Sequence, residues 1–426
     1  MFPSTVTRSG PAFTCPFTLS SPGEVLLALT AAVPDTNWSA KGREAAAVRI
    51  FLDGAYHQDV VLFAGAEPFT YRRGLGEVPA GTHHLEMAFS EPVASPNSQR
   101  AELLDLEVMP LALDEELALV YRYAPLLHGR RLKHPYENGQ TDTPLVAFHR
   151  RWPTEKGLRI EYQMIWSHED AGTSASALLA RWGHVSDIEW IFRVTVGPDG
   201  ALLEQEYQGP EHVTTPFRGR FELGKHPVLQ TATINNNVTD RITSAHRFLL
   251  LPEAAWPAGR AREAVMAAHP WTYRISALEV ARQVGFQRPG DPSQPAVSDL
   301  RNYLWLELDR STLSGSAGLL GLEAQVQLRF SHWYRSSFGK PLLAKREDGP
   351  YSTAVKLPDG TRPEEITAIA AALAPPVVGG KLLVRGPLSA FMLDEQYLPS
   401  RSLAVTCREV ILSRGSSQAT LWQQGI

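Results

Sequence analysis

Cysteine is scarce in this sequence, which has only Cys15 and Cys407 among its 426 residues. The two lie far apart and match no zinc-ligand spacing, no CxxC pair and no framework of a disulfide-rich domain. We therefore expect two isolated thiols. A single disulfide between them is the alternative if the protein is exported.

Long hydrophobic runs are also missing. No stretch of 18 apolar residues occurs, so we expect no membrane-spanning helix. The first residues lack a charged segment followed by an apolar one, and an extracellular or periplasmic location is favoured only if a signal peptide has been removed. The formal net charge is −4 and the pI about 6.4, so nothing indicates a nucleic-acid partner.

Several common catalytic motifs are absent. The sequence has no GxGxxG after a strand, no P-loop, no GxSxG and no HExxH, which argues against dinucleotide-dependent, nucleotide-hydrolysing, serine-hydrolase and zincin chemistry. A glycosidase with two carboxylates stays open, because its acids need not be close in sequence.

The composition favours strands. Glycine and proline are abundant, at 32 residues each, and apolar runs are short, as in chains of many strands joined by turns. We expect a mainly β, multi-domain protein of antiparallel, jelly-roll-like β-sandwich modules with a few peripheral helices. Its domains would span 1–115, 119–290 and 300–426. Helical patterns occur at 259–269, 275–284 and 362–374.

The N-terminal module shows hairpin signals. AVRIFLDG (47–54) ends in an Asp-Gly turn signal and is followed by YHQDVVLF (56–63), which predicts paired strands. The phrase PAGTHHLEMAF (79–89) resembles the closing hairpin of jelly-roll carbohydrate-binding modules. A β-sandwich without a ligand is the alternative. Trp38, Tyr56 and Tyr71 are candidates either for sugar stacking or for the core.

The most specific chemistry lies in 158–196. In the expected strand at 187–196, strict alternation puts Asp187 and Glu189 on one polar face with Arg193, and His184 precedes the strand. One imidazole and two carboxylates so close together predict a divalent-cation site. The alternative is a salt-bridged sheet face in which Arg181 or Arg193 neutralises the two acids.

The string GHVSDIEW (183–190) resembles the GHRHDWE motif of the necrosis-inducing cytolysin family and the HxGDWE motif of the related vacuolar-protein-sorting-like family. The resemblance covers residues 121–240 and includes YAP at 123–125, TDTPL at 141–145 and HPV at 226–228. It implies a β-sandwich with His184, Asp187 and Glu189 as cation ligands. An upstream acid would complete them, for which Asp170 is the candidate, with Glu169 and His168 as rivals. Ser186 and Ile188 depart from the motif, so cytolytic activity is not carried over.

A second polar cluster follows the motif. His212 or His226 would act as general base, and Lys225 or Arg218 would hold an anionic group. Each histidine has an ordinary surface or core role as its alternative. Asn236 and Tyr162 complete the predicted substrate-binding residues.

We expect a metal-assisted, glycan-active enzyme, either a polysaccharide lyase or a glycoside hydrolase. Its cation would be Ca²⁺ or Mg²⁺, with Mn²⁺ possible, and its partner a glycan. One alternative is a non-enzymatic, cation-dependent protein that binds a glycan or a glycolipid head group. The other is a structural envelope protein.

Overall fold

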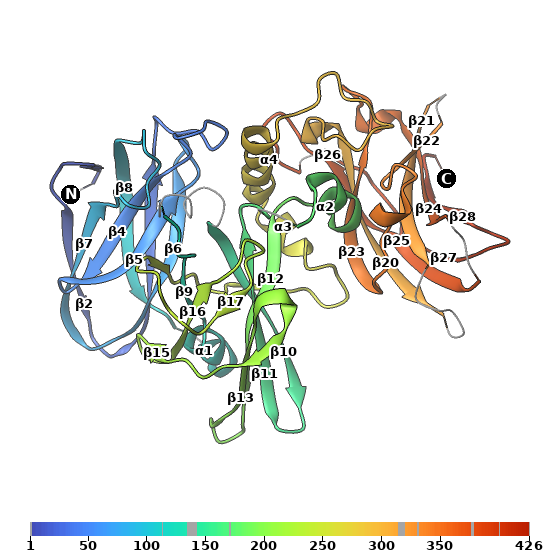
Figure 1. Cartoon of the computed structure of the whole chain (residues 1–426). Helices are drawn as coiled ribbons and strands as arrows, with labels where there is room; N and C mark the ends of the chain where they lie inside the picture. The colour runs from blue at the N-terminus through green and yellow to red at the C-terminus, as the bar shows by residue number, and fades with distance from the viewer. Residues whose placement is uncertain are drawn as a thin grey trace. The chain divides into compact units, whose positions relative to one another are not determined.

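The computed structural model describes residues 2–112, 114–133, 143–169, 172–313, 320–329, 332–375, 379–399 and 401–425. Strands predominate and helices are few (Figure 1), which confirms the predicted fold class. The chain divides into one unit of residues 1–171 and 186–255 and a second unit of 172–185 and 256–426. The three modules expected from the sequence stay a prediction. No helix within the described ranges is long and apolar enough to span a membrane, and Cys15 and Cys407 are both free.

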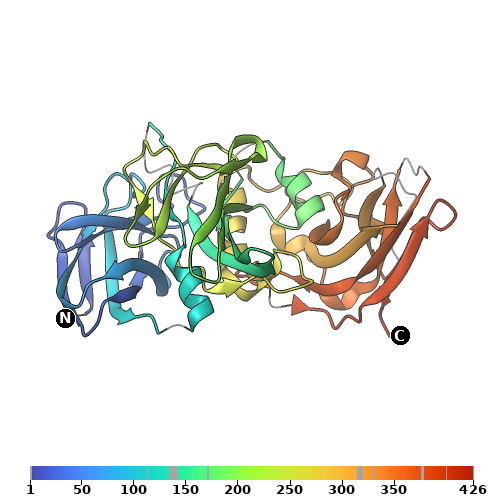
Figure 2. The same ribbon diagram turned by 90° about the horizontal axis from the view of Figure 1, so that it is seen from below.

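The first eight strands form a sandwich of two four-stranded antiparallel sheets, drawn in blue in Figures 1 and 2. One sheet has the order β1 (Ser4–Thr7), β8 (Arg100–Pro110), β3 (Gly23–Ala32) and β6 (Phe69–Val78); the other has β2 (Phe13–Leu19), β7 (Gly81–Phe89), β4 (Ala46–Leu52) and β5 (Ala55–Leu62). This strand order is that of a jelly roll, as the sequence predicted. Asp53 and Gly54 close the β4–β5 hairpin with φ of 51° and 79°, the left-handed backbone that such a two-residue turn requires.

The aromatic residues considered for sugar stacking in this sandwich do not form a surface platform. Trp38 and Tyr71 are 1% and 2% exposed and belong to the core. The hydroxyl of Tyr56 donates to Asp59 at 2.7 Å. The core interpretation is therefore correct for Trp38 and Tyr71, because both side chains are almost completely excluded from solvent.

Two further sheets complete the first unit. The larger has the order β14 (Thr214–Pro216), β13 (Leu202–Gln208), β12 (Asp187–Val196), β11 (Gly157–Trp166), β10 (Pro144–Thr154) and β19 (Ala254–Ala255). The smaller contains β15 (Phe221–Glu222), β16 (His226–Thr231), β9 (Leu126–His128) and β18 (Arg247–Phe248), with β17 (Val238–Thr239) paired to β16. A short helix, α1 (Glu115–Arg122), begins at Asp114, whose carboxylate accepts a hydrogen bond from the Leu117 amide.

The predicted faces of β12 are wrong in part. Phe192 pairs with Tyr162, but the next partner of β11, Gln163, pairs with Trp190, so the register skips one residue. Directly opposed residues share a face, and such a bulge resets the alternation. Trp190 therefore lies on the face of Arg193, whose guanidinium stacks 3.7 Å from its ring centroid. Asp187 and Glu189 still share a face, but it is the face of Phe192.

A row of opposite charges crosses the sheet on the Arg193 face. Register places Arg150, Glu161, Arg193 and Glu206 side by side on four adjacent strands. The fully buried Glu161 carboxylate pairs with Arg150 at 2.6 Å and also with Arg193. Arg181 pairs with Glu347. The partners of Arg193 and Arg181 thus differ from the acids that the salt-bridge alternative assigned to them.

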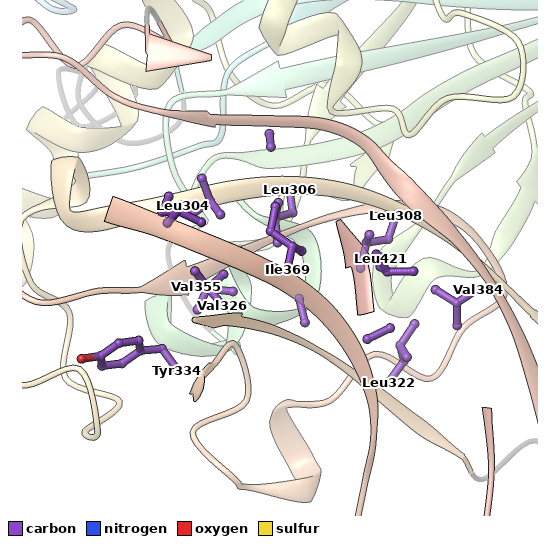
Figure 3. Packing of buried hydrophobic residues seen from close by; sticks show 14 of the residues in the cluster. Leu304, Leu306, Leu308, Leu322, Val326, Tyr334, Val355, Ile369, Val384 and Leu421 are labelled. Carbon is purple, nitrogen blue, oxygen red and sulfur yellow. The ribbon is translucent and has the colours of Figure 1, made fainter. Parts of the chain in front are cut away.

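The second unit is built on another two-sheet sandwich. One sheet has the order β23 (Gly349–Lys356), β20 (Tyr303–Thr312), β25 (Lys381–Met392) and β26 (Arg401–Ser402), with β27 (Arg408–Ser413) also on β25; the other has β22 (Trp333–Arg335), β21 (Gly321–Leu328), β24 (Ile366–Ala374) and β28 (Gln418–Gln423). Figure 3 shows Leu304, Leu306 and Leu308 of β20 in the shared core with Ile369 of β24.

The helices of this unit agree only partly with expectation. α4 (Trp271–Gln283) confirms the pattern at 275–284, and α3 (Ala264–Ala268) covers part of 259–269. α2 (Ala175–Trp182) packs on β23, where the Thr353 hydroxyl donates to the Ala180 carbonyl at 2.7 Å.

The helix predicted at 362–374 is wrong. Residues 366–374 form strand β24, which pairs with β21 and β28. Its alanines pack as small residues on both faces, so the segment lacks the polar alternation by which a half-buried strand is recognised.

Candidate functional site

Glu189, Gln208 and His212 form a linked polar group at the ends of β12 and β13. The Gln208 side-chain amide donates to Glu189 Oε2 at 2.8 Å and to His212 Nδ1 at 2.5 Å. Gln208 is 3% exposed, whereas the His212 side chain is 52% exposed. A buried amide thus joins a partly buried carboxylate to an imidazole that reaches solvent, and Glu189 Oε1 lies 3.7 Å from His212 Nδ1.

Two asparagines surround the same imidazole. Asn235 Nδ2 lies 3.1 Å from His212 Nε2, and Asn237 Nδ2 lies 3.4 Å from Nδ1. When the neutral ring accepts from Gln208 at Nδ1, its proton is on Nε2, which lies beside the side-chain amide of Asn235. The ring is held on both edges, which fixes its orientation.

The turn that carries Asn236 joins this cluster to Asp187. Asn236 is fully buried, and its side-chain nitrogen donates to Asp187 Oδ2 at 2.9 Å. Glu211, His212 and Asn236 have φ of 59°, 61° and 47°. Non-glycine residues adopt this backbone at a cost of roughly 1–3 kcal/mol each and tend to do so at functional sites. The structure therefore brings Asp187, Glu189, His212 and Asn236 together through these hydrogen bonds.

Gly183 and His184, which open the GHVSDIEW string, do not belong to the same unit of the fold as Asp187 and Glu189. Gly183 ends α2 in the left-handed conformation, with φ of 67°, and belongs with His184 to the second unit. His184 is 3% exposed, and its Nε2 lies 3.3 Å from Glu263 Oε1. Asp187 and Glu189 belong to the first unit, so one short motif supplies residues to two units of the fold.

The predicted cation ligands are only partly described. Asp170 lies outside the described residues, as do residues 141–142 of the TDTPL phrase. Among the rivals of Asp170, His168 is buried and Glu169 is partly buried. Within the described ranges, no three His, Cys, Asp or Glu side chains are grouped so as to hold a metal ion. The set of His184, Asp187, Glu189 and Asp170 stays a prediction.

The other predicted catalytic and substrate-binding residues include His226 and Tyr162, whose hydrogen bonds go to groups outside the His212 cluster. His226 is fully buried, with Nδ1 2.7 Å from the Ala124 carbonyl and Nε2 3.2 Å from Glu24. Tyr162 is 1% exposed and donates to the Val120 carbonyl at 2.8 Å. Such burial argues against substrate contact for either residue. Lys225 and Arg218 are exposed, which leaves their predicted roles open.

Gln208 is the residue that sequence reasoning missed. It ends β13 and pairs in register with Thr214 of β14, and its amide is the link between Glu189 and His212. The one available signal was its position four residues before His212, which gains meaning only when the chain turns back at Pro210–His212.

No family model matches the chain, and a search of curated proteins found no significant match. The resemblance to the cytolysin superfamily therefore stays an expectation.

Comparison with solved structures gives partial similarities to carbohydrate-binding modules and carbohydrate-active enzymes. The C-terminal domain of the sugar-binding protein EclA is 14% identical over 26% of this chain and 79% of its own, with a TM-score of 0.20. The CBM36-1 domain of a multidomain xylanase from the hindgut metagenome of Trinervitermes trinervoides is 15% identical over 26% of this chain and 89% of its own, with a TM-score of 0.18. A ruminal GH26 endo-β-1,4-mannanase is 10% identical over 31% of this chain and 35% of its own, with a TM-score of 0.19.

Proposed function

We propose that this protein is a glycan-active enzyme and that His212 is the general base of its reaction. The observation that carries the proposal is the half-exposed His212 imidazole, held by three side-chain amides beside the Glu189 carboxylate. Amides and carboxylates donate to and accept from hydroxyl groups, the groups that a sugar presents. An imidazole oriented in this way is suited to take a proton from a hydroxyl group or a water molecule.

Glu189 supports this role electrostatically. When His212 takes up a proton, the carboxylate 3.7 Å from Nδ1 stabilises the positive charge that forms. The buried Gln208 keeps Glu189 and His212 in a fixed relationship, because its amide nitrogen bonds to both. This division of work between a base and the groups that orient it is common to acid–base catalytic sites.

We further propose that Asp187 and Glu189 hold a divalent cation. The buried amide oxygens of Gln208 and Asn236 have no hydrogen-bond donor in the part of the chain that the structure describes. Carboxylate and amide oxygens are the donors that Ca²⁺ and Mg²⁺ prefer, and Mn²⁺ accepts them as well. The cation would neutralise or polarise an oxygen of the substrate.

The test is incubation of the protein with a broad panel of polysaccharides and glycolipids, with and without added Ca²⁺, Mg²⁺ or Mn²⁺. Products are measured by mass spectrometry and binding by ligand-observed NMR. Cleavage that requires the cation supports the enzyme. Cation-dependent binding without product instead supports the glycan- or head-group-binding alternative. If the protein neither cleaves nor binds any member of the panel, the proposal fails and the structural alternative gains weight.

A further inference from the structure

The outer face of the C-terminal sandwich carries polar and aromatic residues that the sequence analysis did not single out. In β20, Leu304, Leu306 and Leu308 face the core, so Trp305 and Glu307 lie on the opposite face. Register places Trp305 beside Phe391 and Glu307 beside Ser389 on β25. This face is covered rather than exposed, because Trp305 and Glu307 are each 3% accessible to solvent.

Three aromatic rings form one wall of a pocket of about 280 Å³ on this face. The Trp305 and Phe391 rings are parallel, with centroids 6.2 Å apart. Tyr273 of α4 meets both edge-on, at 5.3 and 5.5 Å. This volume is close to the lower end of the roughly 300–1,000 Å³ range of small-molecule sites.

Two buried carboxylates line the same pocket. Glu307 accepts hydrogen bonds from the Arg260 guanidinium at 2.5–3.0 Å and from the Ala261 amide at 2.8 Å. Glu263 is 4% exposed and faces His184, with Arg262 at 3.7 Å. Burial and the charges of these two carboxylates raise the pKa of the Tyr273 hydroxyl. Both carboxylates are therefore held in place by their neighbours, and their remaining lone pairs can accept hydrogen bonds from a ligand.

The pocket also contains a donor without an acceptor. The Trp305 indole nitrogen is buried and has no hydrogen-bond partner among the described residues. A buried N–H group left in this way is destabilising, and a ligand oxygen that accepted from it would remove that cost. Ser352 and Ser389 add hydroxyl groups that donate or accept.

We infer that this pocket binds the terminal sugar unit of an uncharged glycan, and that it is separate from the His212 cluster. The inference rests on the proposed function, because it takes carbohydrate as the ligand class. Aromatic faces match the C–H face of a pyranose ring, while the acids, serines and indole match its hydroxyl groups. The small volume selects a chain end rather than a run of several sugar units.

The charge of the pocket decides between classes of sugar. Glu263 and Glu307 contribute two negative charges, and Arg260 is the cation that also lines the space. An acidic sugar would bring a third carboxylate into a site that is already negative, which like-charge repulsion opposes. The pocket should therefore bind neutral hexoses and exclude uronic acids.

The test compares two exposed alanines of α3. Ala267 lines the pocket mouth, whereas Ala268 is its equally exposed neighbour outside the pocket lining. Saturation-transfer NMR with neutral hexoses and uronic acids is measured on the full chain with Ala267→Trp, Ala268→Trp, Trp305→Phe and His212→Ala. We expect Ala267→Trp to remove hexose binding and Trp305→Phe to weaken it about fivefold to tenfold. Ala268→Trp should bind as the unchanged protein does.

The possible results separate this inference from the proposed function. Hexose binding that survives Ala267→Trp but is lost in His212→Ala overturns the pocket and leaves the proposed function standing. If uronic acids bind with the same affinity as neutral hexoses, the charge argument is wrong, and the assignment of an uncharged sugar as the ligand is wrong with it. If hexoses do not bind while polymers are still cleaved, the pocket inference fails alone. If no carbohydrate binds or reacts, both proposals fail.

Discussion

The imidazole of His184 lies with its Nε2 3.3 Å from Oε1 of Glu263, far along the chain and within the second unit. The motif that His184 opens was predicted to gather its polar residues around one cation. Asp187 and Glu189, its other polar members, instead contact Asn236 and Gln208 in the first unit. Only Val185 and Ser186 separate His184 from Asp187 in the chain, and the two polar environments can be tested separately.

Replacement of His212 by alanine should reduce glycan cleavage by at least about a hundredfold, because general-base catalysis typically contributes that much or more. Initial rates on the substrate identified from the panel provide the measurement. His84→Ala is the matched control, since His84 is also exposed and lies on the N-terminal sandwich. An equal loss in both variants, or none in His212→Ala, would remove His212 from the reaction.

The cation proposal is checked by the metal content of purified protein, measured by mass spectrometry. We expect near-stoichiometric Ca²⁺ or Mg²⁺ in the unchanged protein and its loss in the double variant His184→Ala with Asp187→Ala. Glu155→Ala, which removes an exposed carboxylate elsewhere on the same unit, should keep the metal. Protein that contains no metal, and that no divalent ion stabilises against heat, would contradict the predicted ligand set.

Glu161→Gln should destabilise the first unit by about 2–4 kcal/mol, because two arginines would lose a buried counter-charge. Burial opposes ionisation of Glu161, but hydrogen bonds and charge from Arg150 and Arg193 outweigh it and lower the pKa. A depressed pKa contributes stability above pH of about 4.3, the unfolded value, and loses it as the pH falls further. Urea unfolding between pH 3 and 7 measures both effects. Glu204→Gln, at an exposed position of the same sheet face, should change stability less.

We expect the folded protein to lose stability in mild acid because two of its buried histidines have lowered pKa values. Burial lowers the pKa of both His57 and His128 to about 4. An unfolded histidine takes up its proton near pH 6.5, so stability should fall as the pH drops from about 6.5 to about 4, by up to about 1.4 kcal/mol per pH unit for each residue. Urea midpoints at pH 5.0 and 7.5 test this. The pH dependence should shrink in His57→Gln and stay the same in His84→Gln; an unchanged dependence in His57→Gln would contradict it.

Gly183→Ala should destabilise the second unit by more than Gly259→Ala does, because nothing lies near a β-carbon added at Gly259 in the same unit. Both glycines have positive φ, which costs a β-carbon about 1–2 kcal/mol. Only at Gly183 would the added carbon lie 2.8 Å from the Thr353 amide and 2.9 Å from Ser352. Thermal unfolding of the two variants isolates the cost of this close approach. Equal melting temperatures would show that α2 moves away from β23 easily.

Local patterns in the sequence were enough to predict a strand or a turn wherever the structure of that segment depends mainly on its own residues. The alternation of leucines in β20 and the Asp53-Gly54 turn identify a sandwich strand and a hairpin, because side-chain direction and backbone φ are properties of a few consecutive residues. The sequence singled out Asp187, Glu189, His212 and Asn236 as polar candidates, but the hydrogen bonds that link them appear only in the folded chain.

Other features depended on partners that are distant in sequence. The register skip at Ile191 arises in the pairing of β12 with β11, and β24 is a strand because β21 and β28 flank it. The contact of His184 with Glu263 and the Trp305 pocket have the same origin. The sequence by itself determined the β class and the turns. Only the tertiary structure decided which face each acid occupies and where a buried pocket forms, because burial and pairing are set by residues that meet only in the folded chain.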